Sequence, residues 1–112
     1  MAQGNVGTLF GALADPTRRQ VVQLLSSGPR RAGELASASR TSASTMSRHL
    51  RVLLGAGIVA DERPAEDARA RVFRLRSESI DAVQAWLDEL HAHANAQLMS
   101  FKSHVEGRAR DE

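Results

Sequence analysis

The strongest structural signal in this sequence is the stretch 41–57, TSASTMSRHLRVLLGAG. Wound at 3.6 residues per turn from an N-cap at Ser42, it places apolar and small residues on one side and hydroxyls and guanidiniums on the other. The first side carries Met46, Leu50, Leu53 and Gly57, and the second carries Ser44, Arg48 and Arg51. The stretch therefore predicts a helix with one side in a core. Its polar side has the groups that hydrogen-bond phosphates and base edges.

The segment before this helix predicts a helix-turn-helix. A short helix over residues 31–37, with Leu35 and Ala36 facing inward, is followed by a turn at 38–41. In such a unit the first helix crosses the DNA backbone and the second reads the major groove. We therefore assign residues 31–57 to a helix-turn-helix.

After Gly57 the pattern changes from helical to strand periodicity. Residues 58–62 and 69–76 predict two strands around the turn-rich segment RPAEDA, with Phe73 and Leu75 on one face. A hairpin directly after a recognition helix is the wing of a winged helix, here residues 58–76. Arg69 and Arg71, nearest the tip, are placed to reach phosphates or a narrow minor groove. The alternative is a charged edge that discourages aggregation between strands.

The N-terminal part predicts two helices. Apolar residues recur at helical spacing over residues 6–14, and Asp15-Pro16 is a helix-start signature for a second helix over 17–26. Arg18 and Arg19 lie on its first turn. For these two arginines a solvated face and a phosphate contact are both open.

The last predicted element is long. From an N-cap at Ser77, apolar residues repeat every three or four positions through residue 106, about seven turns. A helix of that length has more apolar surface than so small a domain can cover, which predicts a two-fold dimer built from the first and last helices. The expected interface residues are Val6, Leu9, Phe10, Leu13, Trp86, Leu87, Leu90, Leu98 and Phe101.

Composition narrows the functional classes. Residues 30–76 hold ten arginines and five acidic residues, net +5, whereas residues 77–112 have net charge −4. The basic centre suits a polyanion. The chain has no Cys, which excludes disulfides and thiolate metal sites. No run approaches a membrane span or a signal peptide, so we expect a cytoplasmic protein with no membrane partner.

Several motifs in this order and spacing resemble the ArsR family of small bacterial winged-helix repressors. The motifs are residues 13–19 (LADPTRR), 34–36 (ELA), 47–50 (SRHL) with Leu53, 56–59 (AGIV) and 73–75 (FRL). The resemblance covers roughly residues 9–105 and is closest to the branch without an obvious metal site. It implies a mainly helical winged helix-turn-helix over residues 1–112, with five helices and a hairpin in the order α-α-α-α-β-β-α.

The resemblance also implies a function. Such a protein is a homodimer that binds a palindromic operator in double-stranded DNA and represses its own or a neighbouring promoter until an effector releases it. Carried over position by position, and with the two wing arginines added, the expected DNA-contacting residues are Ser42, Ser44, Thr45, Ser47, Arg48, His49, Arg51, Arg69 and Arg71. A structural role is the alternative for His49, which lies at the edge of the buried side.

Metal sensing is an alternative reading. The Cys pair of the family's thiolate sensors would fall at Ala36 and Ala38. His91, His93 and His104 partly match the zinc-type pattern of the last helix, but the fourth position is Gly107. Four-coordinate zinc or nickel sites need a full ligand set, so we expect no metal or other cofactor, and solvated histidines.

Catalysis is not expected either. Thr45 lies one turn before His49, close enough for a hydroxyl–imidazole contact, but no carboxylate nearby in the sequence is positioned to orient the imidazole. A winged helix that serves as a protein-interaction module is the stronger competitor. It would predict an apolar or acidic recognition face, whereas the face here is Ser, Thr and Arg.

Overall fold

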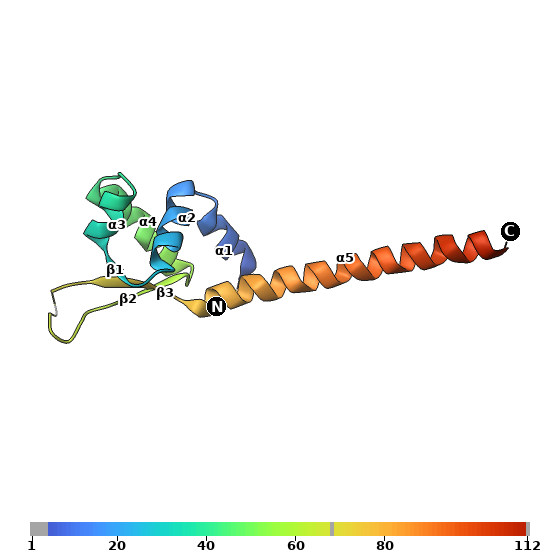
Figure 1. Ribbon diagram of the computed structural model, residues 1–112. Helices are drawn as coiled ribbons and strands as arrows, with labels where there is room; N and C mark the ends of the chain where they lie inside the picture. Colours follow the sequence, from blue (N-terminus) through green and yellow to red (C-terminus); the bar gives the residue numbers. More distant parts are fainter. Residues whose placement is uncertain (1–4, 68, 112) are drawn as a thin grey trace. The chain divides into compact units, whose positions relative to one another are not determined.

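The computed structural model describes residues 5–67 and 69–111 (Figure 1). The described residues fall into two units, divided between Ala82 and Val83. The elements of the chain are α1 (Val6–Leu13), α2 (Pro16–Leu25), β1 (Arg30–Arg31), α3 (Ala32–Ala38), α4 (Ala43–Gly55), β2 (Val59–Glu62), β3 (Val72–Leu75) and α5 (Ser77–Asp111). The mainly helical winged helix-turn-helix expected from the sequence is confirmed, with one added strand.

Side-chain caps start the helices where the sequence predicts them. The carboxylate of Asp15 accepts hydrogen bonds from the backbone N–H groups of Thr17 (2.7 Å) and Arg18 (3.1 Å), and Pro16 is the first residue of α2. Ser42 Oγ accepts from the N–H of Thr45 (3.1 Å) at the start of α4. Each cap satisfies N–H groups that have no partner within the helix.

The end of α4 uses a glycine in the left-handed region. Gly57 has φ +76°, its N–H bonds to the carbonyl of Leu54, and the N–H of Ile58 bonds to the carbonyl of Leu53 (3.0 Å). This pair of bonds is a Schellman motif, which satisfies the last carbonyls and favours glycine at this position. It turns the chain directly from α4 into β2.

The sheet has three strands in the order β1-β3-β2, all antiparallel. The hairpin of β2 and β3 predicted from the sequence is confirmed, but β1 was not predicted, because Arg31 was assigned to the start of α3. Two residues are too few to show a strand periodicity, and β1 is defined by its pairing, Arg30 with Phe73 and Arg31 with Val72. The strands are also shorter than predicted, so Arg69 precedes β3.

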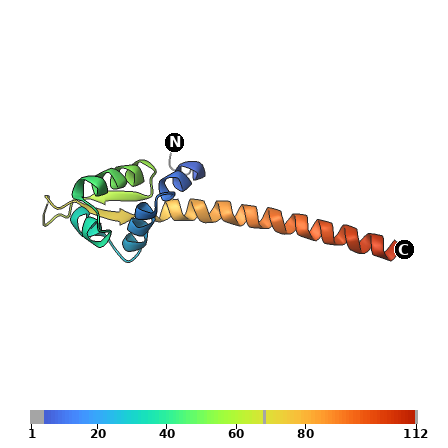
Figure 2. The ribbon, with the colours of Figure 1, turned by 90° about the horizontal axis from the view of Figure 1, so that it is seen from above.

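The helices of the first unit cover one face of this sheet, and the β2–β3 hairpin extends past the ends of α3 and α4 (Figures 1 and 2). Phe73 of β3 is 1% exposed beneath the helices. It shares the core with buried side chains from α1 to α4, from β2 and from the connection between α4 and β2, among them Leu9, Val21, Leu35, Met46, Leu50, Leu53, Ile58 and Val59. The apolar side predicted for α4 is thus confirmed as core.

α5 differs from the prediction at both ends. Ser77 lies inside the helix, and its hydroxyl donates to the carboxylate of Glu78 (3.2 Å) instead of capping. The helix continues five residues past the predicted end, to Asp111. None of the described helices combines the length and apolar character needed to cross a membrane.

Candidate nucleic-acid interface

The outer side of α4 is polar and open to solvent. Ser44, Ser47, Arg48 and Arg51 are all exposed, whereas Met46, Leu50 and Leu53 on the other side are buried. The helical repeat produces this division, since positions three or four apart share a face. The exposed face carries hydroxyls and two guanidiniums, which are donors suited to phosphate and base acceptors.

At the start of α4 the hydroxyls are engaged with one another. Besides capping the helix, Ser42 Oγ donates to Thr45 Oγ1 (2.9 Å) and lies 3.3 Å from Ser44 Oγ. Thr45 is half-buried. These contacts fix the rotamers of the first turn, so its hydroxyls are arranged before any ligand arrives.

His49 faces an arginine from α2. Its Nδ1 lies 3.3 Å from Nη1 of Arg18, and the ring is half-buried. Nδ1 accepts this hydrogen bond when the imidazole is neutral and carries its proton on Nε2. The sequence placed Thr45 within reach of His49, but in the structure Thr45 bonds to Ser42 and His49 faces Arg18.

Arg18 and Arg19 tie α2 to the end of α1. Arg18 Nε donates to the carbonyl of Ala12 (2.5 Å), and Arg19 Nη1 donates to the carbonyls of Leu13 (2.8 Å) and Ala14 (3.1 Å). The last carbonyls of a helix lack partners within it and carry partial negative charge, so guanidiniums stabilise them. The sequence left a solvated face and a phosphate contact open for these arginines, and the structure shows a third setting, in which both contact carbonyls of their own chain.

The pKa of Asp15 is lowered from its ordinary value, chiefly by the backbone N–H of Arg18. The N–H of Thr17 and the nearby His49 and Arg18 side chains act in the same direction. Asp15, the N-cap of α2, is therefore a carboxylate at neutral pH. It lies beside Arg18, which contacts both Ala12 of α1 and His49 of α4.

In the hairpin, Arg71 is held from two sides. Its Nε donates to Oδ2 of Asp61 (2.7 Å), and its guanidinium carbon lies 4.9 Å from the centre of the Phe73 ring. The Arg71 side chain lowers the pKa of Asp61. Neither Asp61 nor Phe73 was expected from the sequence as a partner of Arg71. The strand register would have found them, because it sets Asp61 opposite Phe73.

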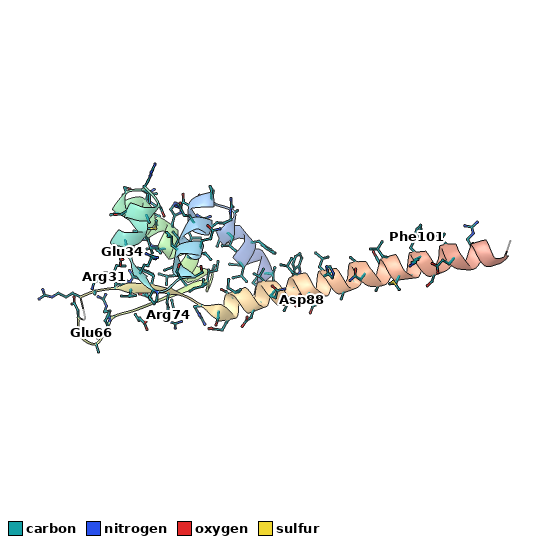
Figure 3. All side chains as sticks on the ribbon, viewed as in Figure 1. Arg31, Glu34, Glu66, Arg74, Asp88 and Phe101 are labelled. Atoms are coloured by element: carbon teal, nitrogen blue, oxygen red, sulfur yellow. The ribbon has the colours of Figure 1, made fainter. Side chains whose placement is uncertain are left out.

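The other wing arginines have different settings. Arg69 is exposed and its backbone N–H bonds to the carboxylate of Asp67 (3.0 Å). Arg74 lies on the face of the sheet away from the helices, 4.0 Å from the carboxylate of Glu62 (Figure 3). At the other end of β3, Arg76 pairs with Glu78.

The structure brings α4 and the hairpin together at an open hollow of about 130 Å³. Its polar lining is Ser47 and Arg51 of α4 and Arg71, the residue before β3. Leu50 and Phe73 contribute to its apolar lining. Three of the expected DNA-contacting residues thus line one cavity, two from the same face of α4 and one from the hairpin.

The histidines of α5 do not gather. His91, His93 and His104 are exposed, and His93 lies 3.3 Å from the side-chain nitrogen of Gln97. No group of three potential ligands that suits a metal ion occurs among residues 5–67 and 69–111. Along a straight helix His91 and His93 point to different faces, and His104 lies about three turns beyond.

Large apolar side chains remain exposed on the helices at both ends of the chain. In α5, Leu90 is 50% and Phe101 68% exposed, and Phe101 projects from the helix surface (Figure 3). Six of the side chains expected at the interface are at least 40% exposed: Phe10, Trp86, Leu87, Leu90, Leu98 and Phe101. The structure adds Ile80, Met99 and Val105 of α5 to this set. Including Leu9 was wrong: it is 1% exposed and belongs to the core of the chain itself.

Known proteins similar to this chain are bacterial regulators. The family described as "bacterial regulatory protein, arsR family" matches residues 15–61. An HTH-type transcriptional regulator, Rv2034 of Mycobacterium tuberculosis, is 41% identical over 83 residues, 74% of this chain and 75% of the relative. The transcriptional repressor SdpR of Bacillus subtilis is 34% identical over 61 residues, 54% of this chain and 68% of the relative.

Solved structures agree with this similarity. The crystal structure of an ArsR family transcriptional regulator has a TM-score of 0.71 at 32% identity, covering 80% of this chain and 90% of that chain. The homodimeric winged helix-turn-helix DNA-binding domain of a possible ArsR-family regulator from Mycobacterium bovis has a TM-score of 0.59 at 25% identity. That match covers 83% of this chain and 81% of the domain.

Proposed function

The chain belongs to the arsR family of bacterial regulatory proteins and is a DNA-binding transcriptional repressor, and we propose that it acts as a homodimer on a palindromic operator. In the proposed mechanism, α4 enters the major groove and the β2–β3 hairpin follows the backbone or the neighbouring minor groove. Repression follows because the bound dimer blocks access to promoter DNA.

The observation that carries this proposal is the division of α4. One side is buried in the core, which fixes the helix, and the other presents Ser44, Ser47, Arg48 and Arg51 to solvent. The neighbouring hollow adds Arg71 from the hairpin. A protein-interaction module would present apolar or acidic groups here. Hydroxyls and guanidiniums instead match the acceptors of the DNA backbone and of guanine.

The proposed contacts divide by role. Arg48 and Ser47 are proposed to contact bases or phosphates in the groove, whereas Arg69 and Arg71 are proposed to contact backbone at the wing. Ser42 and Thr45 order the first turn of α4, and Arg18 holds His49 against α2. The full proposed set is Ser42, Ser44, Thr45, Ser47, Arg48, His49, Arg51, Arg69 and Arg71.

The proposed dimer uses the exposed apolar side chains of α1 and α5. Leaving Phe10, Leu90 and Phe101 in water is unfavourable by roughly 25 cal/mol for each Å² of apolar surface, and a second copy of the chain would cover them. The Mycobacterium bovis domain, which is homodimeric, supports this proposal. Two-fold symmetry would set two copies of α4 about 34 Å apart, one turn of DNA.

A DNA titration tests the function. The purified chain would be titrated into duplex DNA from upstream of its own gene at two salt concentrations, with a scrambled duplex of the same length as control. We expect specific, salt-sensitive binding of two chains per operator, because phosphate contacts release counterions. Equal affinity for both duplexes would contradict an operator in that DNA, and salt-independent binding would contradict α4 as a DNA-reading helix. Repeating the titration with added Zn²⁺ or Ni²⁺ tests whether a metal releases the DNA.

A further inference from the structure

Three residues of the hairpin region lie on the same face of the sheet. The register sets Asp61 opposite Phe73, and Arg71 precedes Phe73 by two residues. Residues opposite one another, or two apart along a strand, share a face. Because Phe73 is buried beneath the helices, Asp61 and Arg71 lie on the side of the sheet that faces α4.

Arg71 is oriented but not buried. Asp61 accepts from its Nε at 2.7 Å, Phe73 lies beneath the guanidinium, and the Arg71 side chain is still 47% exposed. A guanidinium has five N–H donors, and the contact with Asp61 uses one of them. The structure therefore leaves Arg71 able to serve a ligand in the hollow.

The hollow collects donors from two elements. Ser47 and Arg51 of α4 and Arg71 of the hairpin all line it, and its floor is apolar. Two guanidiniums and a hydroxyl around one small cavity suit an anion with several oxygen acceptors, such as a phosphodiester. No carboxylate is among the lining residues, and Asp61 reaches the cavity through its contact with Arg71.

We propose that this hollow takes one phosphodiester group of bound DNA, and that Asp61 is an internal competitor which that phosphate displaces from Arg71. This inference rests on the proposed DNA-binding function and names one contact and one regulating residue within it. In the unbound protein Asp61 keeps Arg71 folded against Phe73. In the complex the phosphate replaces Asp61 as the partner of Arg71, in the hollow between α4 and the hairpin.

Charge explains why the competition matters. Arg71 lowers the pKa of Asp61, so the carboxylate is ionised at neutral pH and the pair has no net charge. A phosphate that binds the free donors of Arg71 comes close to the Asp61 carboxylate, and the repulsion between the two anions drives Asp61 away from the guanidinium. The released carboxylate then needs a counterion of its own. Removing the carboxylate leaves the guanidinium uncompensated, and binding then releases one more counterion than before.

The test compares two charge removals on the same strand. Asp61→Asn and Glu62→Gln each remove one negative charge, but Glu62 pairs with Arg74 on the opposite face of the sheet. Binding to a short duplex of arbitrary sequence would be measured by fluorescence anisotropy between about 50 and 200 mM salt. We expect Asp61→Asn to bind about two- to five-fold tighter than Glu62→Gln, the range of an exposed ion pair. Its plot of log affinity against log salt should be steeper by about 0.9, the value of one phosphate.

A double mutant ties the effect to Arg71. In an Arg71→Ala background, Asp61→Asn should give no more gain than Glu62→Gln does, because the displaced partner is absent. All these side chains are exposed, so thermal unfolding should show that each variant folds.

Three results would overturn the inference. The first is that Asp61→Asn and Glu62→Gln have equal DNA affinities and equal slopes of log affinity against log salt. The second is that Asp61→Asn binds DNA more weakly than the wild type. The third is that Asp61→Asn still tightens DNA binding in the Arg71→Ala background. Each leaves the proposed function standing. Failure of the wild type to bind any duplex at the lowest salt would instead overturn the proposed function, and this contact with it.

Discussion

Arg18 and Arg48 have the same side chain, but the structure gives them different surroundings. Arg18 bonds to the carbonyl of Ala12 and faces His49, whereas Arg48 is exposed on the outer side of α4. The first guanidinium holds three helices together, and the second is available to a ligand. The two residues should therefore separate stability from DNA binding.

Arg18→Ala should lower the free energy of unfolding by about 1–3 kcal/mol, because it leaves helix-end carbonyls without their charged donor. Arg48→Ala should change it by less than about 0.5 kcal/mol. Arg48→Ala should instead weaken operator binding by about 1–3 kcal/mol. Urea unfolding and DNA titration measure the two quantities. Unchanged DNA affinity in a folded Arg48→Ala protein would show that Arg48 is not part of the interface. The control is Lys102→Ala, which removes another exposed positive charge.

Asp15 predicts a dependence of stability on pH. Its pKa is lower in the folded protein than the ordinary 3.8, so the unfolded chain binds more protons. The stabilisation by its charge is therefore complete above pH 3.8 and is lost as the pH falls through the folded-state pKa. Asp15→Asn keeps a good cap but has no charge. The difference in unfolding free energy between wild type and Asp15→Asn should be constant near neutral pH and narrow below 3.8. A difference that stays constant throughout would contradict the argument.

At the scale of elements, local signals predicted well and long-range pairing did not. The caps at Asp15 and Ser42, the buried side of α4 and the exposed side that forms much of the candidate site depend on neighbours within one turn. β1 depends on β3, which lies some forty residues away in the sequence. The Asp61–Arg71 contact was missed for a similar reason, since it follows from the register of β2 against β3.

Gly57 offers a test of how α4 ends. Its φ of +76° is unfavourable for any residue with a Cβ, so Gly57→Ala should destabilise the protein by about 1–2 kcal/mol. Gly33 in α3 is the matched control, because a Cβ added there meets nothing within 4 Å. Gly33→Ala should leave stability unchanged or raise it by up to about 1 kcal/mol. Thermal or urea unfolding measures both, and equal effects would show that the left-handed conformation does not matter.

At the scale of the whole molecule, charge and apolar surface are distributed unevenly. The basic residues concentrate in 30–76, where α4 and the hairpin lie, and the acidic excess falls in 77–112. The exposed apolar side chains concentrate on α5. The proposed division of labour follows from this distribution, with DNA contacts in one part of the chain and pairing of two chains in another.

Leu90→Asp should dissociate the proposed dimer, because it places a charge where apolar surface is to be covered. Ala92→Asp is the control, since two residues along a helix point in nearly opposite directions. Sedimentation velocity should show a lighter species for Leu90→Asp alone, with a loss of operator affinity that is indirect. A Leu90→Asp protein that sediments like wild type would contradict this part of the interface.

The two-residue strand β1 has a mechanical consequence. The chain leaves β1, runs through α3, α4 and β2, and returns as β3 to pair with its own starting point. The pairing of β1 with β3 thereby fixes the spacing between α4 and the β2–β3 hairpin. Where the spacing of the DNA grooves differs from the spacing between α4 and the hairpin, the duplex has to bend or twist to bind. Sequences that deform easily would then be preferred even at base pairs that no side chain touches.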